Sequence, residues 1–141
     1  INSTATSGQG IVIGGGNLYI LAGGDGLDSN SRTAYSGIVF KGGKTVVIST
    51  SGGNSAIDTE AGYTYTSGSV LAIMPNGGMT SEATHCSNFS SVAKKIFMSL
   101  SSGKTLTVSV SNSAILSVKI PCNLSAIVIY LGSTSANISL N

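Results

Sequence analysis

The sequence predicts an all-β protein: a short right-handed parallel β-helix of about three coils, capped by a C-terminal antiparallel sheet. Three observations carry this prediction. Similar segments recur every 22 to 30 residues, apolar and polar residues alternate within them, and paired glycines separate their short strands. No segment with the apolar spacing of an amphipathic helix competes with this pattern.

The repeat is visible when three segments are aligned. Gly10 and Gly37 are 27 residues apart, and Asp28 and Asp58 are 30 apart. Each segment contains two alternating strands and two glycine-containing turns, which is typical of solenoid coils. The segments read GIVIGGGNLYILAGGDGLDSN (10–30), GIVFKGGKTVVISTSGGNSAIDTE (37–60) and YTYTSGSVLAIMPNGGM (63–79).

The coils are therefore predicted over residues 10–80, after an N-terminal tail over 1–9. Residues 81–94 read as a linker or irregular cap. From 95 to 141 the runs KIFMSLS, KTLTVSVS, SAILSVKI, SAIVIYLG and ANISLN predict an antiparallel sheet. This sheet is expected to cover the open strand edge of the last coil.

Composition narrows the class of function. Only 9% of the residues are charged and the net charge is +2, so the clustered basic face of a nucleic-acid-binding protein is absent. No apolar run is long enough to span a membrane as a helix. A polar, uncharged surface rich in Ser, Thr and Gly favours an extracellular or cell-surface location. The two cysteines predict a Cys86–Cys122 disulfide in that setting, and two free buried thiols are the alternative.

Four of the five acidic residues lie in one repeated phrase, GGDGLDSNS and then GGNSAIDTE. Equivalent positions of neighbouring coils stack about 4.8 Å apart. Asp28 is therefore expected beside Asp58, Asp25 near Asn54 or Ser55, and Leu27 and Ile57 inside the core. Adjacent carboxylates repel unless a cation lies between them, and Ca²⁺ binds such oxygens. The candidate ligands are Asp25, Asp28, Asn30, Asn54, Asp58 and Glu60. The alternative is that these residues cap the backbone of their own turns.

The phrases DGLDSN, G-I-x-F-x-G-G-x-x-x-V, NSAID, G-x-x-x-x-S-G-S-V-L-A and GGM resemble a family of bacterial secreted carbohydrate-binding β-helix proteins. The family is similar in topology to polysaccharide lyases without being thought to have lyase activity. The resemblance covers residues 10–79. It implies a calcium-binding β-helix that binds plant cell-wall polysaccharides of the cellulose or pectin type.

The residues themselves favour a binding protein over an enzyme. His85 is the only histidine, and no Ser/His/Asp set or spaced carboxylate pair is apparent. Tyr63 and Tyr65 are two residues apart, so they point to one side of a strand and are candidates for a sugar-binding face, flanked by Tyr19 and Tyr35. The alternative is that these tyrosines only pack against other strand residues.

A third class of function is structural. No polar cap is evident before the first coil, so its strand edge and core are expected to be open. Three explanations of such an end are open: the rest of a longer protein has been removed, the N-terminal tail folds over the end, or the end docks on another subunit. A docking contact that does not close gives a filament. The segment INSTATSG or the terminal SANISLN can also donate a strand to a neighbouring molecule. A self-assembling homopolymer is thus the alternative function, and it is compatible with polysaccharide binding.

Overall fold

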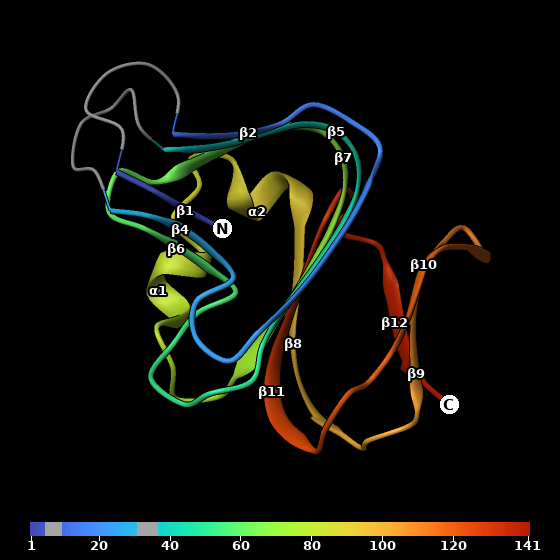
Figure 1. Ribbon diagram of the computed structural model, residues 1–141. Coiled ribbons are helices and arrows are strands. Elements are labelled where there is room, and N and C mark those ends of the chain that lie inside the picture. The colour runs from blue at the N-terminus through green and yellow to red at the C-terminus, as the bar shows by residue number, and fades with distance from the viewer. Residues whose placement is uncertain (5–9, 31–36) are drawn as a thin grey trace.

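The computed structural model (Figure 1) describes residues 1–4, 10–30 and 37–141. In this part of the chain the protein is all-β apart from two four-residue helices, α1 (Thr80–Ala83) and α2 (Phe89–Val92). The strands are β1 (Asn2–Ser3), β2 (Ile11–Ile13), β3 (Asn17–Ala22), β4 (Leu27–Ser29), β5 (Ile38–Ser49), β6 (Ile57–Thr59), β7 (Tyr63–Pro75), β8 (Ala93–Leu100), β9 (Thr105–Val110), β10 (Ser113–Lys119), β11 (Leu124–Leu131) and β12 (Asn137–Leu140).

The largest sheet has six strands and mixed direction. Its order is β2-β5-β7-β11-β8, with β3 also paired to β5. Strands β2 and β3 run parallel to the two halves of β5, and β5 runs parallel to β7. Strand β11 then pairs antiparallel with both β7 and β8. The repeated segments therefore supply the parallel half of the sheet, and the C-terminal strands extend it in antiparallel fashion.

Glycines permit the bend in this sheet, which is visible along β5 and β7 in Figure 1. Gly16, Gly43 and Gly68 have φ of 75°, 81° and 102°, a region that L side chains rarely adopt. The strands also pack closely here, because a Cβ on Gly43 would lie 2.5 Å from the carbonyl oxygen of Gly16. The expected role of glycine at the corners is confirmed at these three positions.

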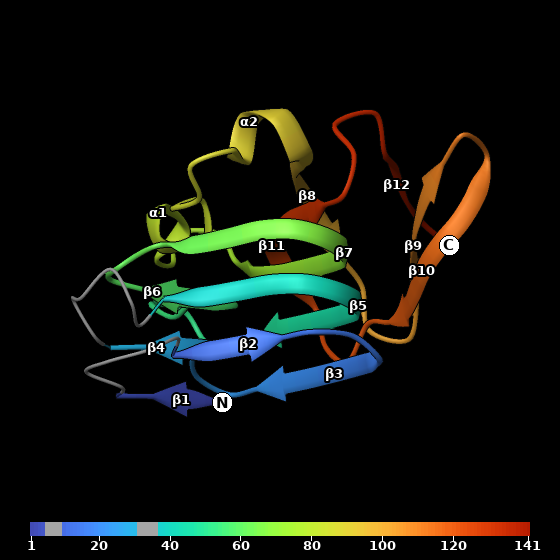
Figure 2. The same ribbon diagram turned by 90° about the horizontal axis from the view of Figure 1, so that it is seen from above.

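A small parallel sheet, β1-β4-β6, lies across from the long strands (Figures 1 and 2). The alternation along its strands decides which face is buried. Leu27 and Ile57 are fully buried in a core cluster with Phe40, Ala72 and Met74, as expected from the sequence. The aspartate that follows each of these two aliphatic residues is directed to the opposite face of the sheet.

A third, antiparallel sheet has the order β10-β9-β12 and covers the other face of the main sheet. The second core cluster joins Val46, Ile48 and Leu71 to Leu106 and Val108 of this layer. In Figure 2 the layer lies at the end of the molecule remote from β1, β4 and β6. The main sheet is thus buried on both faces, which explains its near-continuous apolar runs.

The predicted right-handed parallel β-helix is wrong. The main sheet is mixed, and the described strands form open sheets with no closed or solenoid sheet. The predicted C-terminal cap is also different, because its five strands are divided between two sheets. Strands β8 and β11 continue the main sheet beside β7, since their apolar residues meet both core clusters, and only β9, β10 and β12 form a separate layer.

The all-β composition and the parallel pairing between repeats agree with the sequence. Ile38 of β5 pairs with Ile11 of β2 and with Tyr63 of β7. Strand β11 does cover the open edge of β7, as expected for the C-terminal region. In the described part of the chain neither helix has the length and apolar character that crossing a membrane requires.

Candidate functional site

The first candidate site is a group of acidic residues on β4, β6 and α1. Asp28 of β4 and Asp58 of β6 are register partners on adjacent parallel strands. Their proximity agrees with the spacing argument from the sequence. Both side chains are half-buried, which limits the screening of their repulsion by water.

Asp28 receives two side-chain amide donors. The Nδ2 groups of Asn2 and Asn30 donate to Asp28 Oδ2 at 2.5 and 3.0 Å. The second carboxylate oxygen, Asp28 Oδ1, is buried and has no hydrogen-bond partner among the residues that the structure describes. A buried carboxylate oxygen without a partner is costly, so this atom marks a position where a donor or a cation would stabilise the protein.

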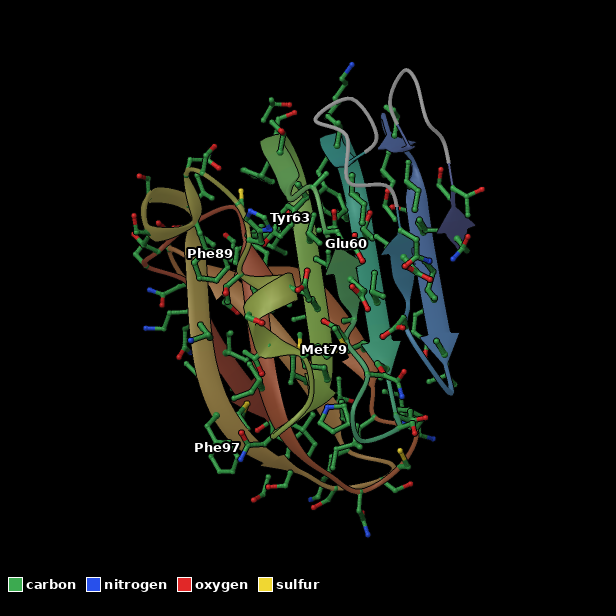
Figure 3. The ribbon with its side chains drawn as sticks, turned by 90° about the vertical axis from the view of Figure 1, so that its left-hand side faces the viewer. Glu60, Tyr63, Met79, Phe89 and Phe97 are labelled. Atoms are coloured by element: carbon green, nitrogen blue, oxygen red, sulfur yellow. The ribbon has the colours of Figure 1, made fainter. Side chains whose placement is uncertain are left out.

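The predicted ligands further along the turns serve the backbone instead. Asp25 Oδ1 accepts a hydrogen bond of 2.8 Å from the backbone N–H of Ser55, which places Asp25 where the repeat predicted. Asn54 Nδ2 donates to the carbonyl of Gly52 at 3.3 Å. Glu60 is exposed at the end of its turn (Figure 3). Asn54 therefore bonds within its own turn, as the turn-capping alternative predicted, whereas Asp25 caps the backbone of the neighbouring repeat.

The sequence argument missed Glu82, the fifth acidic residue of the chain. Helix α1 lies beside β6, and the charge of Glu82 acts on Asp58. Glu82 Oε2 is buried and, like Asp28 Oδ1, has no hydrogen-bond partner within residues 1–4, 10–30 and 37–141. The signal in the sequence is the scarcity of acids: the chain has only five, and Glu82 is the one outside the repeated phrase.

The acidic residues interact electrostatically with Asp58. The pKa of Asp58 is raised from 3.8 to about 6, first by burial and then by Asp25, Asp28, Glu82 and Glu60 in decreasing order. Every one of these contributions raises the pKa, so among the described residues no positive side chain offsets the repulsion at Asp58. The four other acidic residues of the chain thus act on Asp58, and we call the five together the acidic cluster (Asp25, Asp28, Asp58, Glu60 and Glu82).

The acidic cluster does not form a closed metal cage. Among the described residues, no three Asp, Glu, His or Cys side chains converge closely enough to hold a metal ion together. Calcium also accepts amide, carbonyl and water oxygens, so it needs fewer carboxylates than a transition metal needs side-chain ligands. Asp28 Oδ1 and Glu82 Oε2 are each the kind of oxygen that such a hard cation binds, whereas Asp25 and Asn54 already have other partners.

The tyrosines predicted as a sugar-binding face are mostly inside the protein. Tyr63 and Tyr65 are 4% and 8% exposed, and their hydroxyls donate to the carbonyls of Ala83 and Gly68, both at 2.7 Å. The ring of Tyr63 also meets Phe40 edge-on, with centroids 5.8 Å apart. Neither ring is therefore accessible to a sugar in this structure, because the core covers its faces.

The other two tyrosines predicted to bind sugar are Tyr19 and Tyr35. Tyr35 lies outside the described residues. Tyr19, on the edge strand β3, is 53% exposed, because its side chain projects from the face of the main sheet at a place that the β10-β9-β12 layer does not cover. Tyr19 is thus the predicted tyrosine that the structure shows to be accessible to a ligand.

The second candidate site is a groove beside Tyr19, about 240 Å³ in volume, between β3, β5 and β10. Its polar groups are the Asn17 amide, the Lys44 ammonium and the Ser117 hydroxyl, and it has no acidic residue. Its remaining lining is apolar and consists of Leu18, Val46 and Leu116. The sequence did not predict this groove, because β10 follows β5 by more than 60 residues and its docking depends on tertiary packing.

The predicted Cys86–Cys122 disulfide is absent, and both cysteines are free. The backbone of Cys86 forms an isolated parallel β-bridge with Tyr63, at the start of β7. Cys122 lies just before β11, whose residue Ala126 pairs with Pro75 at the end of β7. The length of β7 thus separates the two thiols. Cys86 is buried, and its Sγ donates to Asn88 Oδ1 at 2.9 Å, so the free-thiol alternative describes it.

No protein-family model, curated protein or solved structure matches this chain significantly. The functional argument therefore depends on the groove and the acidic cluster alone.

Proposed function

We propose that the chain is a non-catalytic, extracellular module that binds polysaccharide in the groove beside Tyr19 and is stabilised by calcium at the acidic cluster. The observation that carries the proposal is the exposed Tyr19 ring beside an amide, a hydroxyl and an ammonium group. This combination of one apolar platform and several hydrogen-bonding groups is what a sugar ring requires.

The groove suits a sugar for two separate reasons. One face of a pyranose ring carries mostly C–H groups, and an aromatic ring such as that of Tyr19 offers it a flat apolar surface. The edge of the sugar carries hydroxyls, which the Asn17 amide and the Ser117 hydroxyl can bind as donors or acceptors. Asn17 lies on β3 and Ser117 lies on β10. Each of these strands belongs to a sheet, so the binding groups are held on a rigid frame.

Lys44 favours an acidic sugar. It is the only charged residue that lines the groove, and no carboxylate there competes for its ammonium group. A uronate carboxylate bound in the groove would form a charge-assisted hydrogen bond with Lys44. An acidic polysaccharide of the pectin type is therefore the favoured ligand over neutral cellulose, and its binding should weaken as salt screens the charge.

Calcium is proposed as a structural ion. Asp28, Asp58 and Glu82 are the carboxylates that we expect to move together around a bound ion, because two of them carry buried oxygens without partners among the described residues and the third has a strongly raised pKa. Asn30 and Glu60 follow Asp28 and Asp58 by two residues and are the further predicted ligands. A bound divalent cation would offset the repulsion among these carboxylates.

Retention of the purified protein on a panel of polysaccharides tests the proposed function. We expect retention on de-esterified pectin, weaker retention on cellulose, and loss of both in Tyr19→Ala. Phe97→Ala is the matched control, since Phe97 is an exposed aromatic residue of β8, remote from the groove. No retention on any polysaccharide, or equal retention of the Tyr19 variant, would contradict the proposal.

A further inference from the structure

A hollow of about 460 Å³ lies at one end of the β10-β9-β12 sheet and is larger than the groove beside Tyr19. We call it the β9 hollow, and it is lined by Ser109, Ser111, Asn112, Ser135 and Asn137. Each of these side chains ends in a hydroxyl or a carboxamide, so the described lining has no charged and no apolar side chain. Ligand pockets are usually apolar with a few polar groups, and this uniformly polar lining therefore points to an unusual ligand.

The strand register builds the floor of the β9 hollow. Ser109 of the central strand β9 pairs with Asn137 of β12, so the two side chains lie beside each other on one face of the sheet. That face is the outer one, because Val108 and Ile138 at the alternate positions pack into the second core cluster. In Figure 2 the β9–β10 hairpin and the segment that leads into β12, which supply the walls, lie at the same end of the molecule.

One wall is a two-residue turn with an unusual backbone. Ser111 and Asn112 join β9 to β10 with φ of 50° and 63°, the positive values that a type I′ hairpin turn requires. Among the described residues they are the only non-glycine residues with positive φ, and eight glycines occupy such positions elsewhere. The turn therefore keeps two side chains where Asn-Gly is the favoured pair, and both of them line the β9 hollow. Residues held in such sparsely populated conformations gather at ligand sites.

The hydrogen-bonding groups of the β9 hollow are largely unused by the protein. Ser135 Oγ is paired with Ser133 Oγ at 2.9 Å. The side chains of the other four lining residues form no hydrogen bond within the described chain. At the next cross-strand position of the same face, by contrast, Thr107 Oγ1 and Ser117 Oγ are bonded to each other at 3.1 Å. The β9 hollow thus presents several unpaired groups together, on strands and a tight turn that fix their positions.

We infer that the β9 hollow binds one unit of a neutral sugar, as a second carbohydrate site separate from the groove beside Tyr19. A sugar hydroxyl both donates and accepts hydrogen bonds, as do the serine hydroxyls and the two ends of an asparagine carboxamide. An ion would need a charged partner to replace its water, and the described lining supplies none. A nucleobase or an apolar peptide side chain would need an aromatic or apolar surface, which this lining also lacks. An uncharged ligand with many hydroxyls matches every group that is present.

The β9 hollow and the groove beside Tyr19 meet on the same sheet but differ in chemistry. Ser117 lines the groove and bonds to Thr107, which precedes Ser109 by two residues on the outer face of β9. The groove contains the ammonium group of Lys44, whereas the described lining of the hollow is uncharged. We therefore expect the hollow to bind a neutral sugar without help from the groove, and a polysaccharide with acidic and neutral units to contact both.

Titration of ¹⁵N-labelled protein with cellohexaose, a soluble neutral oligosaccharide, tests this inference. The titration uses Tyr19→Ala, in which the groove lacks its aromatic platform. We expect binding in the millimolar range, too weak for retention on cellulose, with shifts of the amides of Ser109, Asn112 and Asn137. Ser109→Ala should weaken binding about fivefold by removing one hydrogen bond. Ser139→Ala is the matched control and should leave binding unchanged, since this serine is on the same outer face of β12 and does not line the hollow.

Asn112→Gly separates a ligand-binding role of the turn from a structural role. Glycine adopts positive φ without strain, so the melting temperature should be equal to or above that of the parent protein, while cellohexaose binds about fivefold more weakly. Circular dichroism confirms that each variant is folded. Absence of shifts around the hollow, shifts confined to other surfaces, or unchanged binding in both Ser109→Ala and Asn112→Gly would overturn the inference. These outcomes leave the proposed function intact, because pectin retention tests the groove separately, with Tyr19 present.

Discussion

Asp28 and Asp58 are paired in register on adjacent parallel strands, and no positive side chain in the described part of the chain offsets the repulsion at Asp58. This relationship makes the acidic cluster a source of instability in the protein without a bound cation. It also allows the cluster to be tested by substitutions that change charge and leave shape almost unchanged.

Asp58→Asn is expected to raise the free energy of unfolding by about 1 kcal/mol at pH 7 in the presence of a chelator, because it removes a partly screened like-charge interaction. Urea denaturation measures the change. Glu60→Gln is the matched control and should have a smaller effect, since Glu60 is exposed and contributes least to the pKa of Asp58. A destabilised Asp58→Asn protein would show that this carboxylate makes a favourable interaction.

Bound calcium should reverse the order of stability of the wild-type protein and Asp58→Asn. The wild-type protein is expected to melt at a higher temperature in millimolar Ca²⁺ than in chelator, while Asp58→Asn and Glu82→Gln should respond less. Differential scanning calorimetry with Mg²⁺ as a parallel series separates a calcium site from general screening. An unchanged melting temperature of the wild-type protein would contradict the proposed ion.

The stability of the calcium-free protein should fall as pH rises from about 4 to 7. The pKa of Asp58 is about 6 in the folded protein and 3.8 in its unperturbed state, so the folded state binds more protons between these values. The stabilisation is complete below pH 3.8 and disappears as pH rises through 6. Urea denaturation at several pH values measures this slope, and Asp58→Asn should flatten it. An equal slope in the variant would assign the effect to another group.

A comparison of Gly43→Ala with Gly53→Ala separates the loss of stability caused by steric overlap from the loss caused by the positive φ. Both glycines have φ near 80°, but a Cβ on Gly43 would lie within 3 Å of Gly15 and Gly16 atoms, whereas a Cβ on Gly53 would meet nothing within 4 Å. Gly53→Ala should cost about 1 kcal/mol, and Gly43→Ala about 2 kcal/mol more. Thermal denaturation measures both, and equal costs would contradict the tight approach of β3 and β5.

Tyr63→Phe is expected to lower the free energy of unfolding by about 1–2 kcal/mol, since the buried carbonyl of Ala83 loses its donor. Polysaccharide retention should be unchanged, because the Tyr63 ring is inside the core. Reduced retention by a folded Tyr63→Phe protein would restore the role that the sequence suggested for this residue.

The sequence predicted local relationships better than the architecture. The repeat placed Asp28 beside Asp58 and Leu27 and Ile57 in the core, because register and alternation follow directly from spacing. The closure of the strands into a β-helix was wrong, since spacing does not reveal that β11 pairs with β7 in antiparallel fashion. Burial of Tyr63 and Tyr65 escaped prediction for a similar reason: alternation showed that they share a face, and packing decided that this face is internal.

Chemical-shift mapping shows which surface of the protein contacts the polysaccharide and so tests the groove beside Tyr19. ¹⁵N-labelled protein is titrated with de-esterified pectin oligosaccharide, alongside Lys44→Gln and, as its control, Lys104→Gln, whose lysine does not line the groove. We expect shifts of the amides of Asn17, Tyr19, Lys44 and Ser117, and loss of these shifts in Lys44→Gln alone. Absence of shifts in the wild-type protein, or shifts confined to other surfaces, would contradict the proposed binding site.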